Sequence, residues 1–486
     1  MTGHKPFSVL LAPYLPRVLA AALLVFYLLN HFASLPAQAS GIMLVFMVSL
    51  LGVFVLCYKQ HLLSFLALFV PLSTSTPVFE SSNISLPTEP ICLLLTAFFI
   101  TKVILGRKLP LRFLKHPLSL LILADLLWLF ISACTSQMPE VSFKRLIIRT
   151  CYYTAFYYFY SELFSADIQN IRRIFLYYTL GMVLPVVLTV YKHSTIGFIT
   201  IGSEKLSEPY YYDHTIYGAC LAFYLPFTAE LVLKTRAGRL RVLYMALLGL
   251  LFVALLFSYS RAAWLGLLVA LGAFTILRYK VKLRYLAALA ILALLGVWTY
   301  WPELSAKLQG NKQQSHSNEI GTHFKSISNI NTDVSNRERI NRWKCAIRMF
   351  RDKPVFGFGP GTYQFYYGQY QQRADLTRIS TFTGNKGHAH SEYLNYLSET
   401  GLPGLLIFLA LMIVALCKSI RLLRYSGNPE IRQIGAFLFM GLVTYCVHAC
   451  FNGFLEFDKV AFPVFTSLAA IVALDKKDAK SGEKPS

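Results

Sequence analysis

Long apolar runs recur along most of the chain and constrain its fold more than any other feature. A helix that spans a membrane needs about 20 mostly apolar residues. Up to fourteen stretches approach this length, near residues 18–36, 41–57, 62–79, 91–106, 117–135, 146–164, 174–191, 214–233, 242–259, 262–278, 285–301, 402–417, 433–451 and 460–474. Some are short, so we expect an all-α polytopic membrane protein with about 12–14 transmembrane helices.

The composition excludes the main classes of water-soluble protein. Of the 486 residues, 55% are hydrophobic and 14% are charged, whereas a soluble domain carries about 25% charged residues. Lys and Arg outnumber Asp and Glu by 46 to 24. In a membrane protein this excess predicts basic cytoplasmic loops, so binding to nucleic acid is not expected. The nine cysteines form no CxxC or zinc spacing, and we expect them to be small buried residues.

The basic residues also predict an orientation. Loops rich in Lys and Arg alternate with loops that hold few, which places both termini in the cytoplasm. We expect the first apolar segment to be an uncleaved signal anchor. We expect an N-terminal transmembrane bundle over 1–301, a large periplasmic loop over 302–401, C-terminal transmembrane helices over 402–474 and a basic cytoplasmic tail over 475–486.

The polar segment 302–401 is too long for a simple connection and is expected to be functional. Apolar residues at helical spacing predict one helix from Arg337 to Asp352. The glycines of Gly357–Gly361 predict a tight turn, because their spacing fits no nucleotide-binding loop. A second helix is expected from His390 to Thr400, with a glycine at its C-cap.

Arg261 is the first candidate site residue. It lies between two apolar runs, where an arginine requires an anionic partner or a water-filled cavity, since its insertion at mid-bilayer costs about 2.5–3.5 kcal/mol. Arg261 is therefore either a two-pronged ligand for phosphate or pyrophosphate or an arginine that reaches to the interface. Arg339, four residues before Trp343 on one helix face, is either a second phosphate ligand or part of a solvated face.

Several other polar residues could each have either a functional or a structural role. His388 and His390 precede the second loop helix, where a histidine can act as a general base or simply lie at the surface. A metal site is not favoured, because residues two apart do not share a helix face and acidic residues are sparse nearby. Lys144, Arg145 and Arg149 fall on the expected outer side, where they meet either a lipid phosphate or the headgroup region.

Three segments in this order resemble the O-antigen ligase family. They are SYSRAAWLG after an apolar run, RERINRWKCAIRMFRDKPVFGFGPGTYQFYYGQY in the loop, and GHAHSEYLNYLSETGLPGLL before the next run. The resemblance covers roughly residues 210–410, and the loop is similar to that of a branch found in Bacteroidetes. It implies a GT-C-like fold, typically with twelve spans.

The resemblance also implies roles for individual residues. Arg261, in a Ser-Arg-x-x-x-x-Gly setting, and Arg339, before the loop tryptophan, match two arginines of the family that bind substrate pyrophosphate. Arg337 is the alternative to the second arginine. His390 matches the family histidine, although Ser391 stands where commoner members have Asn.

The family reaction is a glycosyl transfer at the periplasmic face of the bacterial inner membrane. A glycan moves en bloc, with inversion, from undecaprenyl pyrophosphate to a sugar hydroxyl on the lipid A-core. The resemblance implies membrane lipids as surroundings, and neither a nucleotide, a metal nor another cofactor. Arginines suit a pyrophosphate leaving group, and a histidine can accept the hydroxyl proton.

Two other functions remain open from the sequence. A polymerase of O-antigen or exopolysaccharide would use the same donor with another lipid-linked repeat as acceptor. A transporter of lipid-linked glycan belongs to a different class. The long outer loop with its histidine and the lack of internal repeats disfavour the transporter.

Overall fold

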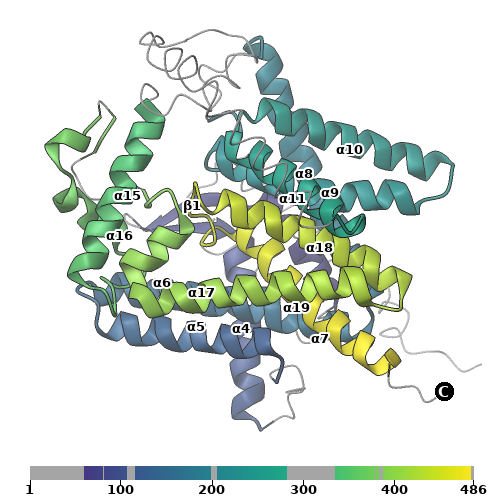
Figure 1. The fold of residues 1–486 in the computed structure, drawn as a ribbon, viewed down its shortest axis with the longest axis horizontal. Coiled ribbons are helices and arrows are strands. Elements are labelled where there is room, and N and C mark those ends of the chain that lie inside the picture. Colours follow the sequence, from purple (N-terminus) through teal and green to yellow (C-terminus); the bar gives the residue numbers. More distant parts are fainter. Residues whose placement is uncertain are drawn as a thin grey trace, which may run out of the picture.

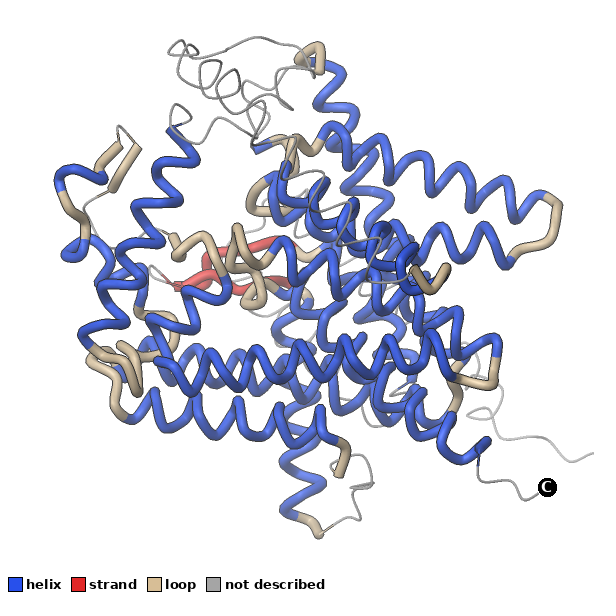
Figure 2. The backbone as a smooth tube through the Cα atoms, viewed as in Figure 1, coloured by secondary structure: helices blue, strands red, loops and turns tan. Residues whose placement is uncertain are grey.

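The computed structural model describes residues 60–79, 82–106, 115–198, 205–281, 334–377, 379–381 and 387–482. The expected spans at 18–36, 41–57 and 285–301 lie outside these ranges. Helices make up nearly all of the described structure, and Figure 2 shows a single short pair of strands among them. The expectation of an all-α membrane protein is therefore confirmed.

Seven helices in the described ranges are long and apolar enough to cross a membrane. They are α5 (Pro117–Cys134), α8 (Gln169–Thr195), α9 (His214–Lys234), α10 (Arg239–Phe257), α11 (Arg261–Arg278), α17 (Glu392–Tyr425) and α18 (Pro429–His448). Each overlaps a span expected from the sequence. The core also contains α4 (Thr88–Ile104) and α19 (Asp458–Gly482).

The expected span at 62–79 is wrong. An apolar helix ends at Leu72, and its last turn is the 3-10 helix η1 (Val70–Leu72). The strands β1 (Thr74–Phe79) and β2 (Ser82–Leu86) then pair antiparallel, with Thr74 opposite Leu86. The polar, β-branched run after the helix favours an extended chain. Its start is held by Ser73, whose hydroxyl accepts from Lys459 Nζ at 2.7 Å.

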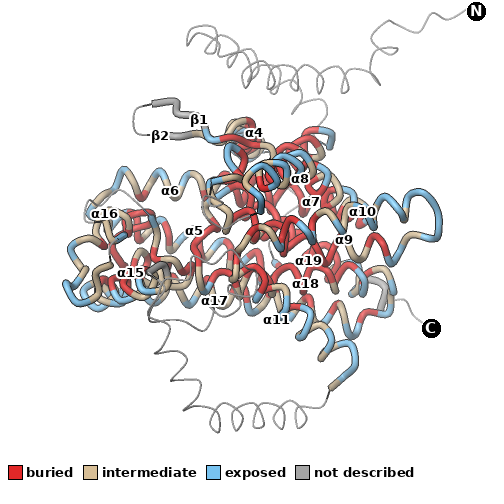
Figure 3. Tube along the Cα trace, turned by 90° about the horizontal axis from the view of Figure 1, so that it is seen from above, coloured by how far each residue is buried: buried red, intermediate tan, exposed pale blue. Residues whose placement is uncertain are grey.

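The expected span at 146–164 is part of a longer helical run. It consists of α6 (Pro139–Tyr152), the π-helical segment η3 (Tyr153–Tyr158) and α7 (Phe159–Ala166). Every residue of η3 is buried, and α19 packs against both η3 and α7. This run therefore lies inside the bundle, which Figure 3 shows as a largely buried centre around α7, α18 and α19.

The loop helix expected at 337–352 is confirmed as α15 (Val334–Asp352). It is followed by the short helices α16 (Tyr363–Tyr366), η5 (Tyr367–Tyr370) and η6 (Arg373–Asp375). Figure 1 shows α15 and α16 together at one side of the molecule, beside the start of α17. Tyr363 and Tyr367 are buried beneath α15 with their rings stacked at 5.4 Å, so this part of the loop has its own small core.

The second expected loop helix starts and ends differently from the prediction. It begins at Glu392, with the Ser391 hydroxyl accepting from Leu394 N. Gly401 has φ +70° and breaks the helix as expected, but the chain then resumes helical geometry to Tyr425. Just after the break, Leu402 N donates to Pro354 O in the turn after α15 at 2.9 Å. Pro403 lies in the first turn of the resumed helix, where a missing N–H costs no hydrogen bond.

Helix order brings several chain segments to one end of the bundle. The helices α11 and α18 pack against each other, and Ser260 Oγ, just before α11, lies 3.4 Å from Nε2 of His448 near the end of α18. At the same end, Glu392 N at the start of α17 donates to Ala449 O just after α18. The beginnings of α11 and α17 therefore meet the end of α18, and α15 packs on α17 beside them.

Candidate functional site

Arg261 is the first residue of α11, directly after a sharp turn from α10. Tyr259 in that turn has φ +50°, a left-handed conformation that few non-glycine residues adopt. Trp264 Nε1 donates to Leu255 O at 2.8 Å and ties the start of α11 to the end of α10. A Cβ on Gly218 would lie 2.7 Å from Ser260 Cβ, so α9 also packs closely against the turn. Arg261 therefore projects from a rigid corner.

Arg339 and Trp343 lie one helical turn apart on α15. Trp343 Nε1 donates to the main-chain carbonyl of His390 at 3.1 Å. The preceding residue, Arg342, pairs with Glu338 one turn earlier and also donates from Nη1 to the carbonyl of His388 at 3.3 Å. Two side chains of α15 thus hold the backbone of the histidine segment.

The two histidines lie against each other before α17. Their ring centroids are 4.7 Å apart, and His390 N donates to Nδ1 of His388 at 3.0 Å. His390 has φ +49°, which histidine tolerates better than most residues. Backbone conformations of this kind persist where the surroundings hold them, and they concentrate at functional sites. His388 therefore supports the position of His390.

Both histidines have lowered pKa values. Burial lowers the pKa of His388 to about 4, against an opposing effect from Asp213. Burial, followed by His388 and the cations of Arg342 and Arg339, lowers the pKa of His390 well below its usual value. Both rings are therefore neutral at pH 7, which is the state in which a histidine can accept a proton.

Asn452 is a site residue that the sequence analysis missed. It is buried in the segment after α18, and its side-chain amide lies close enough to His390 to act against the lowering of the pKa of that imidazole. Nδ1 of His390 is buried without a hydrogen-bond partner among the described residues. A buried polar atom without a partner is stabilised when a ligand forms a hydrogen bond to it. The only signal for Asn452 in the sequence is an amide directly after an apolar span.

Arg261 and Arg339 line one cavity of about 410 Å³, together with Asn336. The rest of its wall is mostly apolar, from Trp264, Leu265, Leu268, Ile340, Trp343 and Phe451. His390 does not line this cavity, but Trp343 does and bonds to its carbonyl. The structure thus brings the two arginines together at the wall that holds the histidine. Their roles in binding stay predictions.

The remaining candidates lie elsewhere. Arg337 is exposed on α15 and does not line the cavity. Arg145 pairs with Glu456, and the Arg149 guanidinium is buried near the rings of Tyr153, Tyr396 and Phe465 at 5.7–5.9 Å. Lys144 is exposed on the same helix. Arg145 and Arg149 therefore contact the bundle, and none of the three α6 cations lines the cavity of Arg261 and Arg339.

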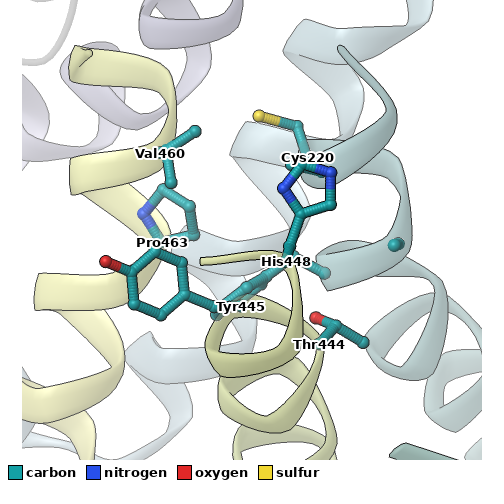
Figure 4. A pocket seen from close by; sticks show the side chains of 9 residues that line it. Cys220, Thr444, Tyr445, His448, Val460 and Pro463 are labelled. Carbon is teal, nitrogen blue, oxygen red and sulfur yellow. The ribbon is translucent and has the colours of Figure 1, made fainter. Parts of the chain in front are cut away.

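A smaller pocket, which is lined by a histidine, lies deeper in the bundle. It is lined by Cys220 of α9, His448 and Tyr445 of α18, and Val460 and Pro463 of α19. Figure 4 shows the His448 ring directed toward Cys220 between the three helices. This pocket is only about 10 Å³, so it does not hold a sugar. In the described residues no group of three or more His, Cys, Asp or Glu side chains could hold a metal ion.

Comparisons with known proteins agree with the resemblance seen in the sequence. Residues 245–409 match the family model of O-antigen ligases. This segment begins within α10 and ends within α17, so it contains Arg261, Arg339 and His390. It leaves out α18 and Asn452. About a third of the chain is thus similar to O-antigen ligases.

One relative is an uncharacterized protein of Haemophilus influenzae, 25% identical over 160 residues. The aligned part is 33% of this chain and 38% of that protein, so the chain matches well under half of its relative's length. Neither match supports the Bacteroidetes-type branch. The family match and the seven apolar helices are consistent with a multi-pass membrane protein similar to O-antigen ligases.

Proposed function

We propose that the protein is a membrane glycosyltransferase of the O-antigen ligase type. The observation that carries this proposal is the cavity shared by Arg261 of α11 and Arg339 of α15, next to the Trp343 contact with His390. Two guanidinium groups suit a pyrophosphate, because each offers paired N–H donors to phosphate oxygens. The apolar wall suits the start of a polyprenyl chain. The proposed donor is therefore a glycan on undecaprenyl pyrophosphate.

The proposed reaction is a single displacement with inversion. A hydroxyl oxygen of a lipid A-core sugar attacks the anomeric carbon of the glycan, and the bond from that carbon to the pyrophosphate oxygen breaks. Undecaprenyl pyrophosphate leaves with the bonding electron pair, and Arg261 and Arg339 stabilise its growing charge. His390, neutral at pH 7, accepts the hydroxyl proton. No metal ion is assigned a role.

The proposal also includes the orientation of the protein in the membrane. The alternation of basic loops predicts that the cavity lies on the periplasmic side of the inner membrane, where the lipid A-core is exposed. The site is also held by several packed helices, which are α11, α15, α17 and α18. Such a rigid frame suits catalysis, because it keeps the reacting groups in the geometry that the reaction needs.

Reconstitution of the purified protein tests the proposal. Lipid-linked glycan would be supplied in liposomes with either the lipid A-core or a second lipid-linked repeat as acceptor, and the products separated on a gel. We expect glycan on the lipid A-core. Lengthening of the lipid-linked chain alone would identify a polymerase, and movement of the glycan lipid across the bilayer without transfer would identify a transporter.

A further inference from the structure

A second large cleft lies at the other end of α11 from Arg261. It has a volume of about 500 Å³ and lies between the ends of α11 and α17 and the start of α18. The 18 residues of α11 separate the two sites, which corresponds to about 27 Å along a helix. Because the hydrocarbon core of a bilayer is about 30 Å thick, the two cavities lie at opposite faces of the membrane.

The cleft is basic. Its lining includes Arg278 and Lys280 from the end of α11, Arg424 from α17 and Arg432 from α18. All four are exposed, and none of the lining residues is acidic. The nearby carboxylate of Glu430 is already bound by Arg172 and Lys234. Four cations from three helices therefore surround one hollow without a neutralising acid in its wall.

The other part of the wall is apolar, from Phe274, Leu277, Leu423 and Ala436. Phe274, Leu277 and Leu423 also belong to the apolar contact between α11, α17 and α18, so the cleft opens where that contact ends. Beyond it, α11 exposes Leu271, as a helix facing lipid does. The opening of the cleft is thus polar and positively charged. Its apolar wall continues into a helix surface at the depth where lipid acyl chains lie.

The backbone also shapes this end of the bundle. Lys280 has φ +51°, and Val281 N donates to Ile276 O at 3.1 Å, which closes α11 with a left-handed turn. Arg432 Nη1 donates to Ser426 O in the turn between α17 and α18. The positions of two of the four cations are therefore determined by helix ends and not by a flexible tail.

We propose that this cleft binds the phosphate headgroup of an anionic glycerophospholipid. Basic clefts between transmembrane helices at the cytoplasmic side bind such headgroups, because the phosphate meets several cations while the acyl chains stay in the bilayer. A free phosphate ion shares the headgroup chemistry but makes no use of the apolar wall. The proposal requires only that the helices span a membrane, and it does not depend on the glycosyl transfer proposed above.

Native mass spectrometry of the full-length protein in detergent tests this site, with phosphatidylglycerol and phosphatidylcholine as probes. Both lipids carry a phosphate, but the choline cation of phosphatidylcholine would meet the four cations of the cleft with a like charge. We therefore expect phosphatidylglycerol to bind at least about tenfold more tightly. The double variant Arg278→Gln/Arg424→Gln should lose this preference. Ala436→Trp, which fills the cleft and leaves its charge unchanged, should lose it too. High salt should weaken the binding.

The matched control is Arg236→Gln/Arg239→Gln, which removes two exposed arginines from the same end of the bundle outside the cleft. It should keep the preference. An equal loss in this control would show a general attraction to the basic face and overturn the proposal. Equal binding of the two lipids, or full displacement of phosphatidylglycerol by millimolar inorganic phosphate, would overturn it as well.

Discussion

At the residue scale, the site consists of side chains whose backbone is held before any substrate arrives. Tyr259 and His390 both have positive φ, and each lies beside a candidate site residue or is one. Trp343 and Arg342 bind the carbonyls of the histidine segment. The cost of such conformations, about 1–3 kcal/mol each, is offset by these contacts. The chemistry expected from Arg261, Arg339 and His390 is therefore testable by conservative substitutions.

Arg261→Lys and Arg339→Lys should each lower ligation by about 10- to 100-fold while the protein still accumulates. Lysine keeps the charge but loses the two-pronged fork, and a charge-assisted hydrogen bond contributes about 1.5–3 kcal/mol. The measurement is the initial rate in liposomes. Arg337→Lys is the matched control on the same helix and should stay near wild type. Full activity in either test variant would remove that arginine from the site.

His390→Ala should lower the rate by about 10²–10⁴ without loss of donor binding, as expected for a general base. The rate of His388→Ala should fall much less, because the His388 ring only supports His390, by accepting a hydrogen bond from its main-chain N–H. Initial rates and binding of labelled donor measure the two effects separately. Equal losses in both variants would contradict this assignment.

The pH profile provides a separate prediction for His390. The base must be neutral, so kcat/KM rises with pH through the pKa of the free enzyme. Because the surroundings of His390 lower its pKa, this rise should lie below the usual histidine value of about 6.5, with a plateau from pH 7 upward. His390→Gln should lose the rise. A profile of His390→Gln that matches wild type at every pH would assign the histidine a structural role.

At the element scale, the break in α17 connects the loop to the bundle. Trp128 Nε1 and Ser132 Oγ of α5 donate to the carbonyls of Thr400 and Glu399 at 2.8 and 3.2 Å. On the loop side, Phe358 N and Gly359 N donate to the carbonyls of Ser398 and Glu399. The turn after α15 is therefore fixed to α5 through the first part of α17, and this helps to position α15, which shares a cavity with the start of α11.

Gly401→Ala should destabilise this connection. A Cβ at Gly401 would lie 2.0 Å from Val355 O, and the φ of +70° disfavours any side chain. We expect a clear drop in the apparent Tm in detergent, equivalent to at least about 1–3 kcal/mol. Gly272→Ala in α11 is the control, because nothing lies within 4 Å of its added Cβ, and it should be neutral or slightly stabilising. An unchanged Tm for Gly401→Ala would show that the break is not required.

At the scale of the whole molecule, the two large cavities lie at opposite ends of α11, so orientation decides which face each one serves. The basic loops predict the Arg261 end to be periplasmic and the Arg278 end cytoplasmic. Each end has an exposed residue that can be replaced by cysteine for labelling. Arg351 on α15 lies at the Arg261 end, and Arg236 between α9 and α10 lies at the Arg278 end.

Cysteine labelling should show this orientation. Arg351→Cys should react with a membrane-impermeant maleimide in cells with a permeabilised outer membrane, and Arg236→Cys should react only after lysis. The background variant would carry serine at the exposed Cys134, Cys417 and Cys450. The opposite pattern would place the Arg261 cavity in the cytoplasm and exclude an acceptor on the periplasmic side.

The sequence by itself predicted the seven described helices that can span a membrane, because an apolar run can satisfy its backbone in lipid only as a helix. It also determined α15 and the break at Gly401, since helical periodicity and glycine conformation are local properties. The prediction of a span at 62–79 was wrong, because hydropathy did not distinguish a helix followed by a hairpin from a longer membrane-spanning helix.

Only the tertiary structure decided which polar residues meet. Arg261 and Arg339 share a cavity, whereas Arg145 pairs with Glu456 and Arg149 is buried among aromatic rings. Asn452 reaches His390 from a segment that follows α18. No local pattern distinguishes these cases, because the partners lie far apart in the chain and are brought together only by the packing of α11, α15, α17 and α18.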